Sequence, residues 1–222
     1  MSTGDRPDTR VRLTGFHALK HALRFGAVIE RAAAPDPAAV LALAERLAPD
    51  LVARLEQLIE TDTGLPEVEA LARRPAVRLE AILAAPGRLV LLERPTHLGN
   101  LGAAIRVAAA AGVAGVLTTG PADPWHEQAL RGGAGLQFAL PVVRLEALPA
   151  VDRPILALDP AGEPLAPGSL PPDAILAFGS ERSGLTPGLR ARAARVLAIP
   201  MRPGVSSLNL ATAVAVVLYC GR

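Results

Sequence analysis

The amino-acid sequence predicts an α/β protein whose main domain contains a mostly parallel β-sheet, preceded by a small helical module. Three observations support this prediction. Short apolar runs of strand length recur from residue 88 onward. Helical stretches separate some of these runs, a pattern typical of a parallel sheet covered on both faces. Before residue 85 the apolar residues recur at helical spacing instead, so we predict two domains, 1–85 and 86–222.

The N-terminal module shows helical periodicity in two segments. In the stretch GFHALKHALRFGA, Phe16, Leu19 and Leu23 share one face of a predicted helix. A second apolar pattern with helical spacing runs through residues 40–58 and is broken at Pro49. The APDPAA segment between the two is typical of a turn followed by a helix start.

The second domain contains the apolar runs that we expect to form the sheet. The predicted strands are residues 88–93, 115–119, 154–159, 174–179 and 195–200. The predicted helices are residues 98–111, 187–195 and 210–219, and the last of these is apolar enough to be a buried helix. A mostly parallel sheet with helices on both faces follows from this alternation.

Composition restricts the kind of partner. The 222 residues are 50% hydrophobic and 20% charged, as in ordinary soluble proteins. Aromatic residues make up only 3%, which disfavours a base-stacking surface. The net charge is +2, and every basic residue except Lys20 and the histidines is arginine, which gives mild support for nucleic-acid binding.

Several classes of protein are disfavoured. A single cysteine, Cys220, excludes an internal disulfide framework. The N-terminal segment is charged rather than apolar, and no apolar run is long enough to cross a bilayer. We therefore expect a cytoplasmic protein with no membrane partner. His17 and His21 have helical spacing but no acidic or thiol partner nearby, so packing or solvent exposure is favoured over metal binding.

Polar loops follow predicted strands, at the edge where open α/β sheets bind ligands. The first, ERPTHLGNLGAAIRV, places Asn100 at a helix entry and Arg106 on the helix. The second, FGSERSGL, places Glu181 between two glycines. Taken singly, a helix cap, a solvated arginine and a polar surface loop explain these residues equally well.

The third loop, IPMRPGVSSLN, leads into the apolar C-terminal helix. Capping would explain one polar residue at this helix start, but hardly Ser206, Ser207 and Asn209 together. Exposed backbone N–H groups at a helix start suit an anionic or carbonyl partner. The third loop is therefore a candidate ligand site.

Together, the three loops resemble the SpoU (TrmH) family of RNA ribose 2'-O-methyltransferases, members of the SPOUT superfamily. The first family motif is matched by Asn100, Gly102 and Arg106. The second is matched by Gly179, Glu181 and Gly184. The third is matched by Ile199, Pro200, Met201, Ser207, Leu208 and Asn209. Order and spacing agree over residues 88–222, so the set is far more specific than any single motif.

This resemblance implies a C-terminal deep trefoil knot, a homodimer and S-adenosylmethionine as cofactor. The implied cofactor-binding residues are Gly179, Ile199, Met201 and Leu208. The N-terminal 85 residues are similar to a reduced form of the substrate-recognition extension that some members carry.

The implied reaction is methylation of a ribose 2'-hydroxyl in tRNA or rRNA. This hydroxyl is a poor nucleophile, so a group must take or share its proton. Arg106 is the candidate, either as a general base with a perturbed guanidinium or as a phosphate clamp that stabilises the developing alkoxide. Ser207 and Asn209 would orient it, and Glu181 would position Arg106 or Asn100.

Two alternatives stay open: a non-catalytic knotted RNA-binding protein, and an RNA methyltransferase that acts on a base nitrogen. The sequence also departs from the family pattern at two places. Residues 96–99 form an insertion before Asn100, and Gly133 stands where members commonly carry serine.

Overall fold

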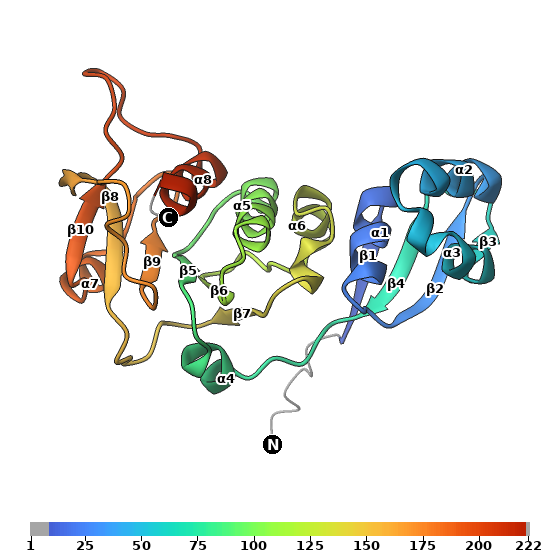
Figure 1. The fold of residues 1–222 in the computed structure, drawn as a ribbon, viewed down its shortest axis with the longest axis horizontal. Coiled ribbons are helices and arrows are strands. Elements are labelled where there is room, and N and C mark those ends of the chain that lie inside the picture. The colour runs from blue at the N-terminus through green and yellow to red at the C-terminus, as the bar shows by residue number, and fades with distance from the viewer. Residues whose placement is uncertain (1–8, 221–222) are drawn as a thin grey trace.

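The computed structural model describes residues 9–220, which form two α/β modules side by side (Figure 1). The first module contains a four-stranded sheet in the order β1-β4-β2-β3. Strand β4 is antiparallel to β1 and β2, whereas β3 is parallel to β2. Its elements are β1 (Arg10–Thr14), α1 (Phe16–Arg24), β2 (Ile29–Ala34), α2 (Pro37–Leu47), a 3-10 turn (Pro49–Leu51), α3 (Val52–Leu58), β3 (Ile59–Thr61) and β4 (Glu69–Arg73).

The prediction of a small helical N-terminal module is therefore wrong, because the module also contains a four-stranded sheet. The helix expected in GFHALKHALRFGA is α1, and Phe16, Leu19 and Leu23 are on its buried face. The break at Pro49 does separate α2 from α3. The missed strands β2 and β4 are rich in alanine, and Ala32 is 1% exposed. Alanine favours helices, so its burial in a sheet core is decided by tertiary packing that local propensity does not report.

The second module contains a six-stranded sheet in the order β10-β8-β9-β5-β6-β7. All its paired strands are parallel, as predicted. Its strands are β5 (Leu89–Leu92), β6 (Gly115–Thr119), β7 (Val142–Leu145), β8 (Ile155–Pro164), β9 (Ile175–Phe178) and β10 (Arg195–Ala198). Its helices are α4 (Leu79–Ala84), α5 (Leu98–Ala110), α6 (Glu127–Gly132), a 3-10 turn (Leu136–Phe138), α7 (Pro187–Ala191) and α8 (Leu210–Cys220).

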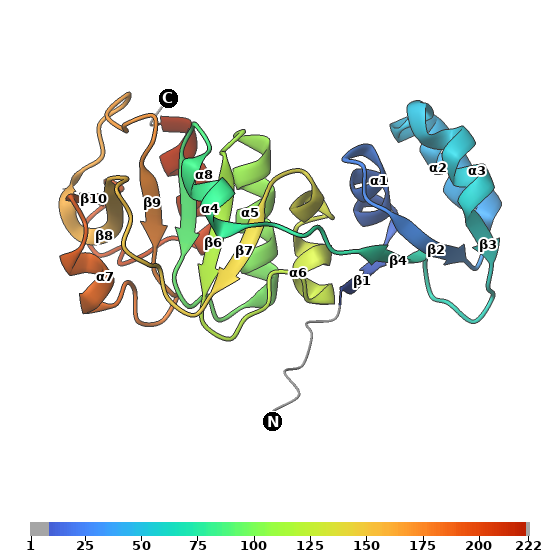
Figure 2. The same cartoon turned by 90° about the horizontal axis from the view of Figure 1, so that it is seen from below.

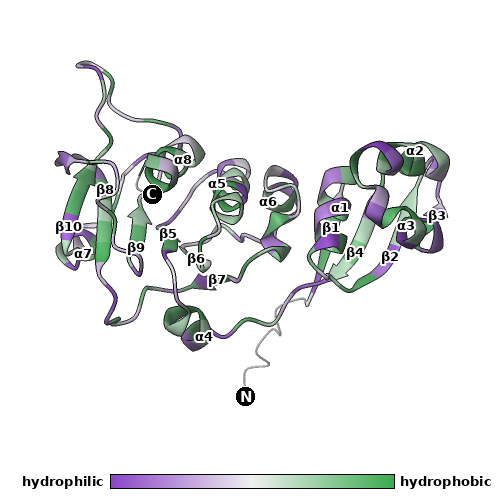
Figure 3. Cartoon of the chain, in the orientation of Figure 1, coloured by the Kyte–Doolittle hydropathy of each residue, from purple (hydrophilic) through white to green (hydrophobic). Residues whose placement is uncertain are grey.

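The parallel sheet is covered on both faces, which explains why its central strands read as unbroken apolar runs. Helices α5, α6 and α8 lie on one face and α4 and α7 on the other (Figures 1 and 2). In β5, Leu89 and Leu91 pack in one apolar cluster with Ile82 of α4. Val90 and Leu92 pack in the cluster on the opposite face. Figure 3 shows the hydrophobic colour of β8 and β9 between these layers.

The two modules meet where α1 packs on residues 131–138. The Nδ1–H of His21 donates to the carbonyl oxygen of Ala134 at 2.7 Å. Gly135 has φ 74°, and a Cβ there would lie 2.4 Å from the carbonyl oxygen of Ala18. Arg131 also forms an ion pair with Glu67 of the first module at 2.7 Å. None of the described helices is both long and apolar enough to cross a membrane.

Gly102 allows α5 to approach α6 at backbone distance. A Cβ at this position would lie 2.1 Å from the carbonyl oxygen of Ala129 and 2.7 Å from the amide nitrogen of Gly133. Real Cβ atoms do not occur at such distances, so only glycine fits without moving a helix. The glycine of the first sequence motif therefore has a packing role.

Gly102→Ala should lower the free energy of unfolding by about 2–3 kcal/mol, because the added methyl group forces two backbones apart. Gly99→Ala is the matched control, since Gly99 lies in the same helix and a Cβ there meets nothing within 4 Å. That substitution should be neutral or stabilising by up to about 1 kcal/mol. Urea denaturation of both variants measures the difference, and equal effects at the two positions would contradict this packing account.

Candidate functional site

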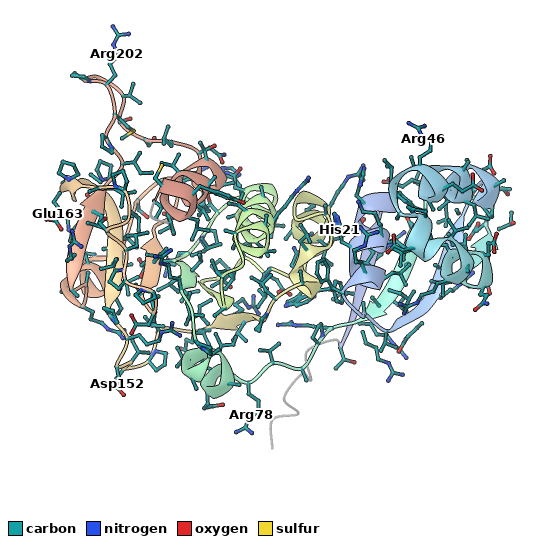
Figure 4. The ribbon with its side chains drawn as sticks, viewed as in Figure 1. His21, Arg46, Arg78, Asp152, Glu163 and Arg202 are labelled. Atoms are coloured by element: carbon teal, nitrogen blue, oxygen red, sulfur yellow. The ribbon has the colours of Figure 1, made fainter. Side chains whose placement is uncertain are left out.

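Three loops meet at the carboxyl edge of the parallel sheet. They follow β5, β9 and β10, and the third leads into α8 (Figure 1). In Figure 4 this third loop extends away from the body of the module, with Arg202 at its tip. Parallel strands bring their carboxyl ends to one edge, so loops far apart in sequence become neighbours. Helices α5 and α8 pack against each other beside this edge.

A pocket of about 420 Å³ lies between the loops after β9 and β10, within the volume range of small-molecule sites. Among the residues that line it are all four predicted cofactor-binding residues: Gly179, Ile199, Met201 and Leu208. Two predicted catalytic residues, Glu181 and Ser207, also line it. The pocket is therefore bounded by residues of both the second and the third motif.

Gly179 shapes this pocket because it has no side chain. A Cβ there would lie 2.1 Å from the carbonyl carbon of Gly184 and 2.2 Å from the amide nitrogen of Leu185. The loop after β9 turns back on itself here, and Ser180 and Gly184 form two reciprocal backbone hydrogen bonds of 3.0 and 3.1 Å. The glycine spacing of the second motif is thus required by a tight turn.

A chain of hydrogen bonds joins the three loops. The side-chain amide of Asn209 donates to Oδ1 of Asn100 at 2.9 Å. The amide of Asn100 in turn donates to Oε1 of Glu181 at 3.0 Å. The other carboxylate oxygen of Glu181 accepts from the backbone N–H and the hydroxyl of Thr96 at 3.0 and 2.9 Å. One carboxylate therefore fixes the loops of all three motifs relative to one another.

Glu181 is a stable carboxylate at neutral pH. Partial burial favours the neutral acid, but the hydrogen bonds from the Asn100 side chain and from the Thr96 backbone outweigh it and lower the pKa of Glu181 to about 2. A carboxylate with such a pKa is a poor acceptor for a proton near pH 7. Its geometry suits positioning of Asn100 and of the loops.

Asn209 has two roles at the start of α8. Its Oδ1 accepts from the backbone N–H groups of Ala211 and Thr212 at 2.9 and 3.4 Å, which caps the helix. Its amide nitrogen meanwhile contacts Asn100. Capping thus accounts for one of the polar residues at this helix start, while Ser206 and Ser207 line the pocket.

Among the described residues, no side-chain hydrogen bond joins Arg106 to the other predicted catalytic residues. It is exposed on α5, does not line the pocket, and within residues 9–220 forms no hydrogen bond with Ser207 or Asn209. Its charge instead acts on Lys20 and His21 of α1, whose pKa values are lowered first by burial and further by nearby positive charges that include Arg106. The described residues therefore show no contact by which Ser207 or Asn209 would orient Arg106.

Sequence reasoning missed several residues of the site. Thr96 belongs to the segment interpreted as an insertion, yet it binds Glu181. Glu93, 8% exposed, accepts from the backbone N–H and the hydroxyl of Thr186, both at 2.7 Å, and so fixes the far end of the second loop. Leu158 and Asp159 line the pocket from an irregular part of β8. Of these residues, only Glu93 could have been found from the sequence, because it is an acidic residue at the end of an apolar strand.

The known proteins that this chain resembles are RNA methyltransferases. The sequence model of the SpoU rRNA Methylase family matches residues 87–219. A 23S rRNA (uridine(2479)-2'-O)-methyltransferase of Streptomyces viridochromogenes is 33% identical over 188 residues, which cover 78% of this chain and 64% of that protein. A 23S rRNA (guanosine(2553)-2'-O)-methyltransferase of Bacillus subtilis is 32% identical, over 72% of this chain and 66% of its own length. The chain thus spans just under two thirds of these curated relatives.

Solved structures share the fold over nearly the whole chain. The SpoU methyltransferase AviRb from Streptomyces viridochromogenes, in complex with AdoMet, matches with a TM-score of 0.79 and 24% identity over 98% of this chain and 93% of that chain. A structure described as an RNA 2'-O ribose methyltransferase matches with a TM-score of 0.70 and 27% identity over 96% and 88%. These matches include the first module as well as the second.

Glu181→Gln should lower the free energy of unfolding by about 1–2 kcal/mol at neutral pH, because three hydrogen bonds lose a charged acceptor. Folding lowers the pKa of Glu181 from 4.5 to about 2, so its contribution is present above pH 4.5 and is lost as the pH falls toward 2. The difference between the two proteins should therefore shrink over that window in urea denaturation.

Glu80→Gln is the control for this experiment, because the Glu80 side chain is 76% exposed. It should change the free energy of unfolding by less than about 0.5 kcal/mol at every pH. A difference for Glu181→Gln that stays constant down to about pH 3 would contradict the role given to its carboxylate.

Proposed function

The chain belongs to the SpoU rRNA methylase family, and from this membership we propose that it methylates a ribose 2'-hydroxyl of RNA with S-adenosylmethionine as methyl donor. The observation that carries the proposal is the joining of three motif loops at one pocket through Glu181, Asn100 and Asn209. The relatives named above act on 23S rRNA, so ribosomal RNA is the first substrate to test and tRNA the second.

The residues of the pocket fit the proposed cofactor. Apolar side chains of Ile199, Met201 and Leu208 line it, as an adenine ring and a methionine chain require. Gly179 allows the loop after β9 to fold tightly onto the backbone of Gly184 and Leu185, which shapes this side of the pocket. When bound there, S-adenosylmethionine supplies an electrophilic methyl group on its sulfonium.

The chain's own residues must orient the acceptor and deal with its proton. The 2'-oxygen would take the methyl group from the sulfonium, the sulfur would keep the bonding electron pair, and the hydroxyl proton would pass to solvent water. Ser207 lines the pocket and Asn209 lies between the lining residues Leu208 and Leu210, so we propose that both contact the target nucleotide. Glu181 is a positioning residue, because its carboxylate fixes Asn100.

Arg106 is the proposed contact to the RNA backbone beside the acceptor. Its exposed position on α5 supports a phosphate clamp that stabilises negative charge on the developing alkoxide. A guanidinium keeps its proton in proteins, which favours this role over that of a general base.

We also propose the finer features of the family for this chain. These are a deep trefoil knot formed by the C-terminal segment, a homodimer, a cytoplasmic location, and a division into a substrate-recognition module and a methyltransferase domain, with the boundary before α4, which packs on the second sheet. The packing of α8 against α5, beside the loop that precedes α8, supports the knot. The separate sheet of the first module and its contacts to residues 131–138 support the division into two parts.

Arg106→Ala should abolish methyl transfer while leaving the affinity for S-adenosylmethionine within about threefold, because Arg106 is outside the pocket. The measurement is transfer of a tritiated methyl group to ribosomal RNA that lacks the modification, followed by nucleoside mass spectrometry. Calorimetry gives the cofactor affinity. Methylation of a base nitrogen, or cofactor binding without any transfer by the unmodified protein, would overturn the proposed function.

The homodimer proposal rests on the apolar surface of α8 and the loop before it. Val205, Leu208 and Tyr219 are 48%, 39% and 50% exposed, so this segment presents three large apolar side chains to solvent. Light scattering should give twice the chain mass at micromolar concentration. Replacing Leu208 and Tyr219 with serine should shift the mass toward the monomer, and a monomeric unmodified protein would contradict this assembly.

A further inference from the structure

Helix α1 of the first module has one basic face. His17, Lys20, His21 and Arg24 are spaced i, i+3, i+4 and i+7, which aligns their side chains along one side of the helix. The apolar side chains of the same helix are buried between the first module and the 3-10 turn of the second. Figure 4 shows His21 at the junction between the modules, so the basic face borders the second module.

The basic face is held in a fixed position relative to the second module. His21 is hydrogen-bonded to the Ala134 carbonyl at 2.7 Å. The left-handed Gly135 brings that loop into backbone contact with Ala18 of the same helix. A side chain at Gly135 would separate the two modules, so α1 docks through contacts that allow little sliding.

Helices α1 and α5, which carry Lys20 and Arg106, both pack on the 3-10 turn Leu136–Phe138, so two positive charges lie on the two sides of this junction. Burial lowers the pKa of Lys20, and the positive charges of Arg24 and Arg106 lower it further, against a smaller opposing effect of Asp50. Arg24 is paired with Asp50 at 2.5 Å, so that carboxylate is already engaged. Within residues 9–220, the side chains of Lys20 and Arg106 form no hydrogen bond or ion pair. Asp50, the carboxylate that opposes this repulsion at Lys20, is thus shared with Arg24.

We infer that Lys20 and Arg106 together bind the phosphate backbone of the substrate RNA across the module junction, with Lys20 as a positioning residue that holds the strand beside Arg106. This inference rests on the proposed function and adds a specific contact from the first module. Lys20 is the single lysine of the chain, a compact charge that suits phosphate. An RNA phosphate between these side chains would relieve their repulsion and would fix the position of the RNA relative to the pocket.

The test compares charge reversal at two places in the first module. Lys20→Glu and Arg46→Glu make the same change in net charge, but Arg46 is exposed on α2 at the outer end of the module (Figure 4). Binding of a fluorescein-labelled RNA stem-loop is followed by anisotropy over a range of salt concentrations. Lys20→Glu should weaken RNA binding about tenfold and reduce by about 1 the slope of the logarithm of the binding constant against the logarithm of salt concentration. The RNA affinity of Arg46→Glu should stay within about twofold of that of the unmodified protein.

Two further measurements separate positioning from folding. Lys20→Arg should restore RNA binding, and the affinity of Lys20→Glu for S-adenosylmethionine should stay within about twofold. In the transfer assay, Lys20→Glu should raise the KM for RNA much more than it lowers kcat.

The inference is overturned if Lys20→Glu binds the stem-loop as the unmodified protein does, or if Arg46→Glu weakens binding equally. If Lys20→Glu loses RNA binding and the unmodified protein transfers no methyl group, the result would support the RNA-binding surface and contradict the proposed function. Methyl transfer with the same KM in Lys20→Glu would support the function and overturn this inference.

Discussion

The arrangement of the site depends on one carboxylate. Glu181 accepts hydrogen bonds from Asn100 and Thr96 of the loop after β5, and Asn100 is bonded to Asn209 of the loop after β10. These loops are distant in sequence, and no other described side-chain contact joins all three. Since the low pKa of Glu181 keeps it charged, its bonds to Thr96 and Asn100 are charge-assisted, and they hold the loops without help from a ligand. The pocket is therefore preorganised before a substrate arrives.

A second constraint is the close approach of backbones at glycines. Gly102 allows α5 to contact α6, and Gly179 allows the second loop to fold onto Gly184. Gly133 shows the same logic, because Gln137 fills its space and a Cβ would lie 2.4 Å from Oε1. Gln137 is completely buried and donates to two backbone carbonyl groups, so it occupies the room that a serine at Gly133 would need. These close backbone contacts fix the positions of the helices and loops whose side chains form the hydrogen bonds of the site.

The sequence predicts the parallel sheet and the loops of the site well, because strands buried on both faces are apolar throughout and ligand loops follow them. It fails for the first module, where Ala32 and its neighbours are in strands whose packing outweighs their helical propensity. It also fails for Thr96 and Asp159, because their roles come from neighbours far along the chain. The position of Arg106 beside Lys20 needs the docking of two modules, which local patterns do not encode.

The central claim is that the three loops present a ribose hydroxyl, rather than a base atom, to the methyl donor. The most direct measurement replaces the target nucleotide with its 2'-deoxy analogue and compares methyl incorporation and RNA binding with those of the all-ribose substrate. Transfer should disappear while binding weakens only a few-fold, about 1 kcal/mol, because phosphate contacts supply most of the affinity. Methyl incorporation into the deoxy substrate would contradict the account and identify a base atom as the acceptor.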